Sequence, residues 1–177
     1  MTQILGLDPG PYRSALVVYN GVTVLEHLTL NNDEMLGWLI ILHGSALVPP
    51  GDQRLVIEQV AAMGMAVGAE VFTTVFWDGR FYEAWVNGGQ IAAHLKRHEI
   101  KLHLCGSMRA KDANIRAALI DKFGGASAIG TKKAPGPLYG IHGDQWAALS
   151  VAVTWYERHV KAEAQPALSA RLRRSLR

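Results

Sequence analysis

The sequence predicts a single α/β domain, and three observations lead to this prediction. Strand-like segments joined by a hairpin signal fill the first thirty residues, and helical and strand-like segments alternate from residue 34 onward. Hydrophobic residues make up 49% of the 177 residues and charged residues only 19%, which is enough apolar material for one packed core. We therefore place the domain at residues 1–164 and a basic tail at residues 165–177.

Three strands are expected first, at residues 3–7, 14–19 and 22–29. The pair Asn20-Gly21 between the second and third strands indicates a type I′ hairpin, because both residues tolerate a positive φ. Three capping residues, Asn31, Asn32 and Asp33, then introduce a helix at residues 34–43.

A short apolar strand at residues 55–57 opens the second part and ends at Glu58. Further helices are expected at residues 70–86, 90–99, 111–123 and 144–164, with a strand at residues 101–104 and a loop at residues 126–140. The aromatic residues at 72–85 are expected in the core and in a dimer interface.

Cysteine content and apolar runs exclude several classes of protein. Cys105 is the single cysteine, so an internal disulfide framework and a zinc site made of several cysteines are both excluded. The first residues lack the basic segment and long apolar stretch of a signal peptide, and no apolar run approaches the roughly 18 residues that span a bilayer. We therefore expect a cytoplasmic protein with no membrane partner.

Charge is distributed unevenly along the chain. Residues 1–95 carry three basic and nine acidic side chains, a net charge of −6, whereas residues 96–133 carry nine basic and three acidic ones, a net charge of +6. Residues 134–177 carry six basic and three acidic side chains. This segregation favours a basic surface that faces a polyanion, although a solvated lysine-rich helix face would produce the same pattern.

Three carboxylates stand where predicted elements begin or end. Asp8 follows the first strand, Glu58 ends the fourth, and Asp144 starts the last helix. A carboxylate among apolar neighbours is unfavourable unless its charge is compensated, and a divalent cation compensates it effectively. The plainer interpretations are a turn at Asp8, an ion pair at Glu58 and a helix cap at Asp144.

Four segments carry a recognisable pattern: LGLDPG at residues 5–10, VIEQV at 56–60, MRAKDANIRAAL at 108–119 and HGDQWAALSVAV at 142–153. In order and spacing they resemble the motifs of RuvC-type Holliday-junction resolvases, particularly those of bacteriophages. The resemblance spans about residues 4–155. It implies an RNase H-like α/β fold with a five-stranded mixed sheet, three antiparallel strands followed by two parallel ones, flanked by helices.

The resemblance also implies a function and a set of site residues. It implies a homodimer that nicks paired strands of a four-way DNA junction in a bacterial or phage-infected cell, with Asp8, Glu58 and Asp144 as catalytic metal ligands. Family members usually present four such ligands, two of them three residues apart in the last motif. Here His142 or Asp112 would supply the fourth, and we favour His142.

A second departure concerns an aromatic residue that bacterial members often carry three residues after the second acid. This chain has Ala61 at that position. Either Met63 or Met65 would take its place, or the junction is opened differently.

The implied chemistry is two-metal phosphodiester hydrolysis. Asp8 would bridge two Mg²⁺ ions about 3.5–4 Å apart, with Mn²⁺ able to substitute and no small-molecule cofactor, leaving 5′-phosphate and 3′-hydroxyl ends. DNA phosphates would be bound by five basic residues, so affinity should fall with salt. These residues are Arg109, Lys111, Arg116, Lys132 and Lys133.

Other functions stay open on the sequence. An RNase H-like nuclease acting on RNA or RNA–DNA hybrids would use the same acids, and a non-catalytic junction-binding module would keep them for structure alone. An actin-like phosphotransferase is disfavoured, because no Ser/Thr-rich phosphate hairpin follows Asp8 and 177 residues are too few for two lobes.

Overall fold

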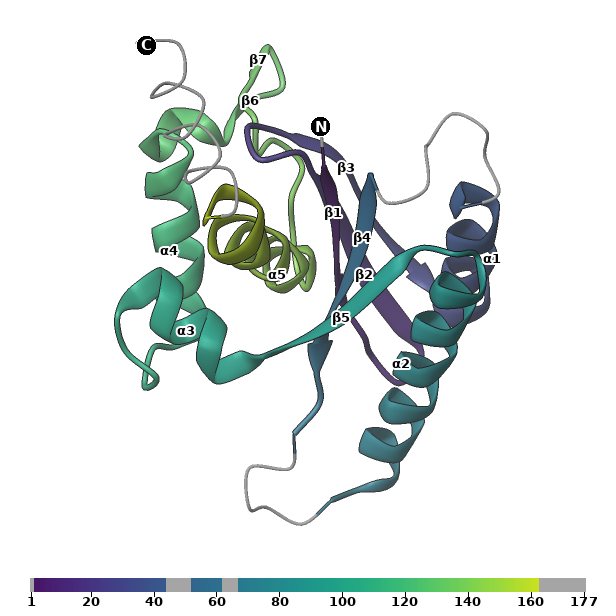
Figure 1. Ribbon diagram of the computed structural model, residues 1–177. Helices are drawn as coiled ribbons and strands as arrows, with labels where there is room; N and C mark the ends of the chain where they lie inside the picture. Colours follow the sequence, from purple (N-terminus) through teal and green to yellow (C-terminus); the bar gives the residue numbers. More distant parts are fainter. Residues whose placement is uncertain (1, 44–51, 62–66, 163–177) are drawn as a thin grey trace, which may run out of the picture.

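The computed structural model describes residues 2–43, 52–61 and 67–162, and it forms a central sheet with helices on both faces (Figure 1). The sheet strands are β1 (Gln3–Asp8), β2 (Arg13–Tyr19), β3 (Val24–Asn31), β4 (Gln53–Gln59) and β5 (Ile91–Lys96). The helices are α1 (Asn32–His43), α2 (Ala69–Asn87), α3 (Arg97–Cys105), α4 (Asp112–Lys122) and α5 (Gln145–Trp155), with a 3₁₀ helix η1 (Gly125–Ala128) and a π-helix η2 (Tyr156–Lys161).

The sheet has the order β3-β2-β1-β4-β5. Strands β1, β2 and β3 pair antiparallel, whereas β1, β4 and β5 pair parallel. This arrangement confirms the predicted five-stranded mixed sheet and the α/β class. It also makes β1 and β4 direct neighbours, which is the condition under which their carboxyl ends meet.

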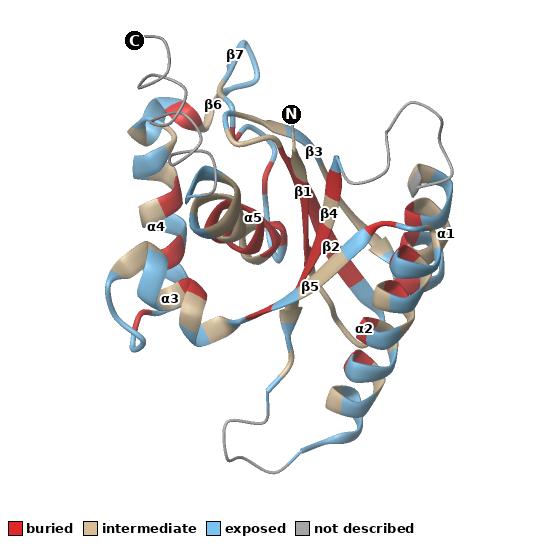
Figure 2. Cartoon of the chain, in the orientation of Figure 1, coloured by how far each residue is buried: buried red, intermediate tan, exposed pale blue. Residues whose placement is uncertain are grey.

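Two apolar layers enclose the sheet, and most buried residues lie on its strands and on the inner faces of the helices (Figure 2). Leu5 and Leu7 of β1 face α1 and α2, where Met35, Leu39 and Phe81 pack against them. The alternate side chains of β1 face α3, α4 and α5. Met35 and Leu39 of α1 have no exposed surface.

One segment differs from the prediction: the expected helix at residues 90–99 is a strand over residues 91–96 and helical only from Arg97, and residues 101–104 are helical instead of a strand. Residues 91–96 form β5, which pairs with β4 from Ile91 to Lys96, and the helix α3 comes afterwards. Ala92 and Ala93 favour a helix locally, but the vacant edge of β4 supplies hydrogen-bond partners that no helix there would have. Buried Ile100 and the positive φ of Gly106 then define α3 and its end.

Smaller differences occur at the turns. The predicted two-residue turn between β2 and β3 is a longer loop at residues 20–23. In this loop the side-chain oxygen of Asn20 accepts hydrogen bonds from the backbone N–H groups of Val22 and Thr23.

The expected loop at 126–140 contains most of η1 and a small hairpin of β6 (Gly130–Thr131) and β7 (Ala134–Pro135). Met63, Met65 and the basic tail lie outside the described residues.

No helix in the described ranges is both long and apolar enough to cross a membrane.

Candidate active site

Strand alternation and register bring Asp8 and Glu58 together. Asp8 lies on the β1 face that carries Ile4, and Glu58 lies on the β4 face that carries Val56. Leu7 of β1 pairs with Ile57 of β4, so one further step of the same register places the two acids side by side. Both carboxylates therefore stand at the carboxyl edge of the sheet, on the side covered by α3, α4 and α5.

Helix α5 reaches this edge because Gly6 allows it to touch β1. A Cβ atom at Gly6 would lie 2.2 Å from the backbone oxygen of Ala148 and 2.8 Å from the backbone nitrogen of Ala152. Only glycine permits this approach without moving backbone. The first turn of α5, with Asp144 just before it, is thereby held against the end of β1.

The start of α5 is also tied to β3 by the buried side chain of Gln145. Its amide nitrogen donates to Thr29 Oγ1 at 3.2 Å, and its oxygen lies 3.1 Å from His27 Nδ1. The same oxygen accepts from the backbone of His142. Gln145 thus fixes the loop that carries His142 and Asp144.

The loop that follows Asp8 is held by a buried polar pair. Ser14 Oγ donates to Asn32 Oδ1 at 2.8 Å, and the Asn32 amide donates to the carbonyl of Gly10 at 3.0 Å. The sequence interpretation of Asn32 as a helix cap is therefore incomplete, since the backbone N–H of Glu34 donates its capping hydrogen bond to the side chain of Asn31. Asn32 instead secures the loop next to the site.

The acids lie close enough to disturb each other's protonation. Burial raises the pKa of Asp8 to about 8, with further increases from Glu58 and Asp144. Burial also raises the pKa of Glu58, although Arg97 opposes this rise. Asp8 makes no side-chain hydrogen bond or ion pair to any residue that the structure describes. The positive charge of Arg97 lowers the pKa of Asp8 only partly, so burial and the neighbouring acids prevail.

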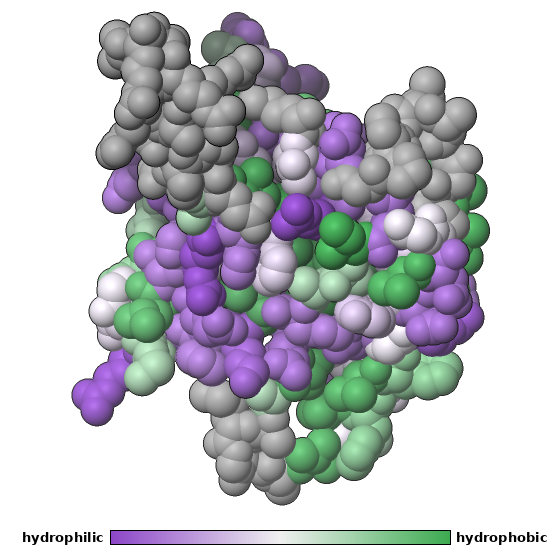
Figure 3. All heavy atoms as spheres, viewed as in Figure 1, coloured by the Kyte–Doolittle hydropathy of each residue, from purple (hydrophilic) through white to green (hydrophobic). Residues whose placement is uncertain are grey.

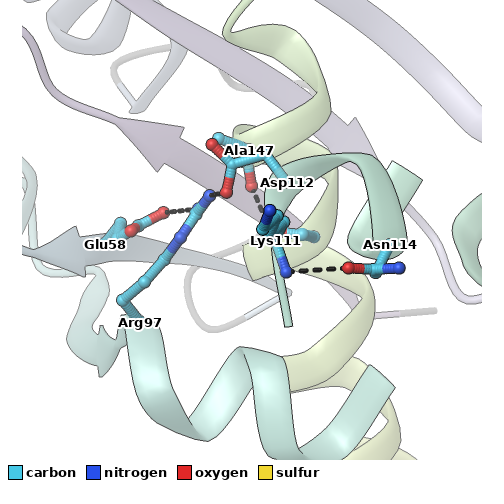
Figure 4. Close-up of polar contacts among 7 residues, drawn as sticks. Glu58, Arg97, Lys111, Asp112, Asn114 and Ala147 are labelled. Carbon is cyan, nitrogen blue, oxygen red and sulfur yellow. Dashed lines mark hydrogen bonds and ion pairs between the residues drawn. The ribbon is translucent and has the colours of Figure 1, made fainter. Parts of the chain in front are cut away.

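Arg97 lies between two of the carboxylates (Figure 4). Its Nη1 donates to Glu58 Oε2 at 2.8 Å, and its Nη2 donates to Asp112 Oδ1. Arg97 begins α3 directly after β5, and Asp112 begins α4, so one guanidinium links three elements at the edge of the sheet. The pKa of Arg97 is raised by the two acids against the effect of burial.

The carboxylate oxygens of the candidate residues are suitable ligands for a divalent cation, but these side chains do not converge on a common position. Carboxylate oxygens are the ligands that Mg²⁺ prefers, and the pKa of Asp8 stays raised although Arg97 lowers it in part. Within the described ranges, no three His, Cys, Asp or Glu side chains converge closely enough to hold a metal ion. One reason is visible in Figure 4, since Glu58 is turned to Arg97.

His142 has the hydrogen-bonding pattern of a metal-ligating imidazole. Its Nδ1 lies 2.7 Å from the carbonyl oxygen of Gly140. A carbonyl oxygen only accepts, so Nδ1 carries the hydrogen and Nε2 of the neutral ring keeps its lone pair. The competing candidate for the fourth ligand, Asp112, is engaged by Arg97.

Solved structures were compared with this arrangement. Thermus thermophilus RuvC matches with a TM-score of 0.61 at 18% identity, over 89% of this chain and 96% of that one. T. thermophilus RuvC in complex with a Holliday junction substrate matches with a TM-score of 0.62 at 16% identity, over 87% of this chain and 92% of that one. This protein has the RuvC fold. No protein-family model and no curated protein sequence matches the chain.

Within this RuvC fold, the expected basic residues divide into two groups. Arg109, Lys111 and Arg116 lie at or near the start of α4, close to Asp112 in the chain. Lys132 and Lys133 form the turn of the β6–β7 hairpin, which Figure 1 shows at the opposite end of the molecule from the carboxyl end of β4. All five are exposed, and only the first group lies close in the sequence to Asp112.

The structure adds residues to the site that sequence reasoning missed. Arg97, Lys101 and Thr74 line a cavity of about 380 Å³ together with Asp8 and Glu58. The prediction placed Arg97 in a helix and Lys101 in a strand, so neither was assigned to this edge of the sheet. A basic residue directly after the strand that pairs with β4 would have been the available signal.

Proposed function

We propose that this protein is a metal-dependent endonuclease that resolves four-way DNA junctions by paired nicks. The observation that supports the proposal is that Glu58 and Asp144 lie near enough to Asp8, at one edge of a RuvC fold, for both to raise its pKa. These are the three acids that the sequence motifs assign to catalysis. The RuvC of T. thermophilus, which has this fold, is known in complex with a Holliday junction substrate.

The residues that would hold Mg²⁺ are Asp8, Glu58, Asp144 and His142. Two bound ions would supply an activated water and a positive charge for the leaving 3′ oxygen, and hydrolysis would leave a 5′-phosphate. The protein's own part is to gather carboxylates that repel one another and to shield Asp8 from solvent. The raised pKa of Asp8 means that this group must give up its proton when a cation binds.

Arg97 and Asp112 complete this arrangement. When Glu58 turns to a cation, the Arg97 guanidinium would keep Asp112 as a partner through Nη2. The N–H groups of Nη1, which now bind Glu58, would then be available to another acceptor. A DNA phosphate is the natural acceptor for such a fork. Release of Glu58 and capture of the scissile strand would therefore occur together.

Recognition of the four-way shape of the junction would require a dimer that carries two active sites. Phe72, Val75 and Phe76 are exposed along the first half of α2, and this area is hydrophobic in Figure 3. Such a surface favours contact with a second copy, because isolated proteins rarely expose a continuous apolar area. A symmetric dimer would present two sites to the two-fold symmetry of a four-way junction.

The test is a cleavage assay on a four-way junction, a linear duplex and an RNA–DNA hybrid, with and without Mg²⁺. We expect the wild type to nick the junction only with Mg²⁺, and Asp8→Asn to bind the junction without cutting it. Asp33→Asn is the matched control, because Asp33 is an exposed carboxylate on α1. It should cut as the wild type does.

Two results would redirect the proposal. Preferential cleavage of the hybrid would identify an RNase H-like enzyme. Binding of the junction that needs no Mg²⁺, with no cleavage by the wild type under any metal, would identify a non-catalytic module. Undiminished cleavage by Asp8→Asn would refute the assigned site.

A further inference from the structure

A second cavity, of about 600 Å³, lies between α4 and the segment that leads into α5. Its walls are largely apolar and come from Ala113, Ala117, Ile120 and Ile141. A flat, polar-edged surface is added by a stacked pair, in which the guanidinium carbon of Arg116 lies 4.9 Å from the centre of the Trp146 ring. Asp112, His142 and Gly143 complete the lining.

This cavity borders the candidate active site. Asp112 lines the cavity and also binds Arg97, which in turn binds Glu58. Gly143 lines it too, and Gly143 directly precedes Asp144. A DNA strand whose phosphate lay at the carboxylates would therefore have its neighbouring nucleoside at the mouth of the cavity.

We propose that this cavity takes an unpaired nucleobase of the DNA strand bound at Asp8, stacked on the Arg116–Trp146 pair. The inference rests on the proposed function, and it names the part of the substrate that is recognised beside the cut. A nucleobase is flat and apolar on its faces and polar at its edges, which matches the cavity in both respects. Arginine planes and aromatic rings are the surfaces on which proteins stack unpaired bases.

The surrounding charge fits DNA as the source of this base. Arg109 and Lys111 are exposed just before α4 and Arg116 is exposed on it, so basic groups flank the cavity where the strand's phosphates would run. Aspartate accepts hydrogen bonds from the exocyclic amino groups of bases. Asp112 at the rim can accept such a bond on the side that does not face Arg97.

The experiment places the fluorescent base 2-aminopurine at successive single positions around the crossover of a four-way junction, with Ca²⁺ in place of Mg²⁺ to prevent cutting. We expect strong quenching on binding at one position beside the predicted cut, because stacking quenches this base. Removing the base at that position should weaken binding by the wild type about 5- to 150-fold, the usual range for one stacked base.

Two variants address the cavity itself. Ala117→Leu fills part of it from the exposed side of α4, and Arg116→Lys keeps the charge while removing the flat guanidinium. Both should lose most of the quenching, and Ala117→Leu should leave the salt dependence of junction binding unchanged. Ala126→Leu, at an exposed position on η1, is the matched control and should behave as the wild type.

The outcomes separate this inference from the proposed function. Tight, salt-dependent junction binding with no quenched position, or quenching that persists in both variants, overturns the base-binding cavity and leaves the nuclease proposal standing. Quenching by free 2-aminopurine deoxynucleoside monophosphate with none in the junction assigns the cavity to a free nucleotide and also overturns it. Failure of the wild type to bind the junction at all overturns both.

Discussion

Arg97 forms ion pairs with two carboxylates, Glu58 and Asp112. Its removal tests how much this positive charge stabilises the buried acid Glu58. Arg97→Gln leaves Glu58 buried without a counter-charge, so we expect the free energy of unfolding to fall by about 1–3 kcal/mol near neutral pH without metal. The loss should shrink toward about pH 4, because a protonated Glu58 needs no partner. Urea denaturation with a chelator present measures both values.

The control for this prediction is Arg158→Gln. Arg158 pairs with Glu99 at 2.9 Å on the surface, where an ion pair contributes at most about 1 kcal/mol. Added Mg²⁺ should restore more stability to Arg97→Gln than to Arg158→Gln, since Glu58 is then free to bind it. Equal losses in the two variants would show that Arg97 does not compensate Glu58.

A second prediction for a single residue concerns the protonation of Asp8. Its pKa is about 8 in the folded protein and near the ordinary value of 3.8 in the unfolded chain, with burial as the main cause. Between these values the folded state binds the extra proton, so without metal this group lowers stability as pH rises from about 4 to 8. Asp8→Asn should remove this loss and be more stable than the wild type at pH 8, by at most about 5 kcal/mol.

The difference should vanish near about pH 4, where Asp8 is protonated in both states. Urea denaturation across this pH range, again with a chelator, measures it. Asp33→Asn should leave the pH dependence of stability unaltered. A constant offset between Asp8→Asn and wild type at all pH values would show that Asp8 is not the buried acid described here.

At the scale of elements, the contact between β1 and α5 holds the site together. Gly6→Ala would drive a methyl group into the backbone of α5, which we expect to lower the free energy of unfolding by about 1–3 kcal/mol and to move Asp144 away from Asp8. Gly37→Ala on α1 is the matched control. Nothing lies within 4 Å of a Cβ there, so the helix should gain up to about 1 kcal/mol.

Thermal unfolding with and without Mg²⁺ measures both consequences. Gly6→Ala should lose stability and also lose most of the shift that Mg²⁺ produces in the wild type. A variant that is less stable but keeps the full Mg²⁺ shift would show that α5 does not position the metal ligands.

The elements also show where local patterns succeed. The apolar run at 55–57 forms the interior of β4. Ile115 and Leu119, which are four residues apart as on one face of a helix, are the buried residues of α4. Residues 91–96 were misassigned because alanine favours a helix when no neighbour is considered, and β5 exists through its pairing with β4. Arg97 was therefore placed inside a helix and not at the start of one directly after β5, and its link to Glu58 was missed.

At the scale of the molecule, the exposed apolar face of α2 predicts a dimer. The side chains of Phe72 and Val75 are 67% and 49% exposed, whereas Phe81 and Trp85 farther along the same helix are fully buried. The expected role of this aromatic segment in the core is thus confirmed for its second half, and its role in an interface stays a prediction.

The double variant Phe72→Glu/Val75→Glu should convert the protein from a dimer to a monomer of 19.3 kDa in sedimentation velocity. Its two nicks in a junction should become uncoupled, because each site would then act alone. Val22→Glu, at a position 70% exposed in the β2–β3 loop, should remain dimeric. A wild type that is monomeric at micromolar concentration would refute this interface.

The positions of the three acids and the three strands that open the fold could be predicted from the sequence because both depend on local patterns. Alternation of apolar residues defines a strand and its two faces, and a carboxylate directly after an apolar strand is visible in a few neighbouring residues. Asp8, Glu58 and Asp144 were singled out in this way, and their catalytic role stays a prediction. The three-strand antiparallel opening of the sheet is confirmed.

Contacts between distant segments could not be predicted, because they depend on how close two backbones come and on which side chains then face each other. The approach of α5 to Gly6, the Arg97 bridge from Glu58 to Asp112 and the cavity beside Trp146 each join residues far apart in the chain. No local propensity encodes such distances. Packing of the whole domain sets them, and with them the raised pKa of Asp8, whose proton a bound cation would have to displace.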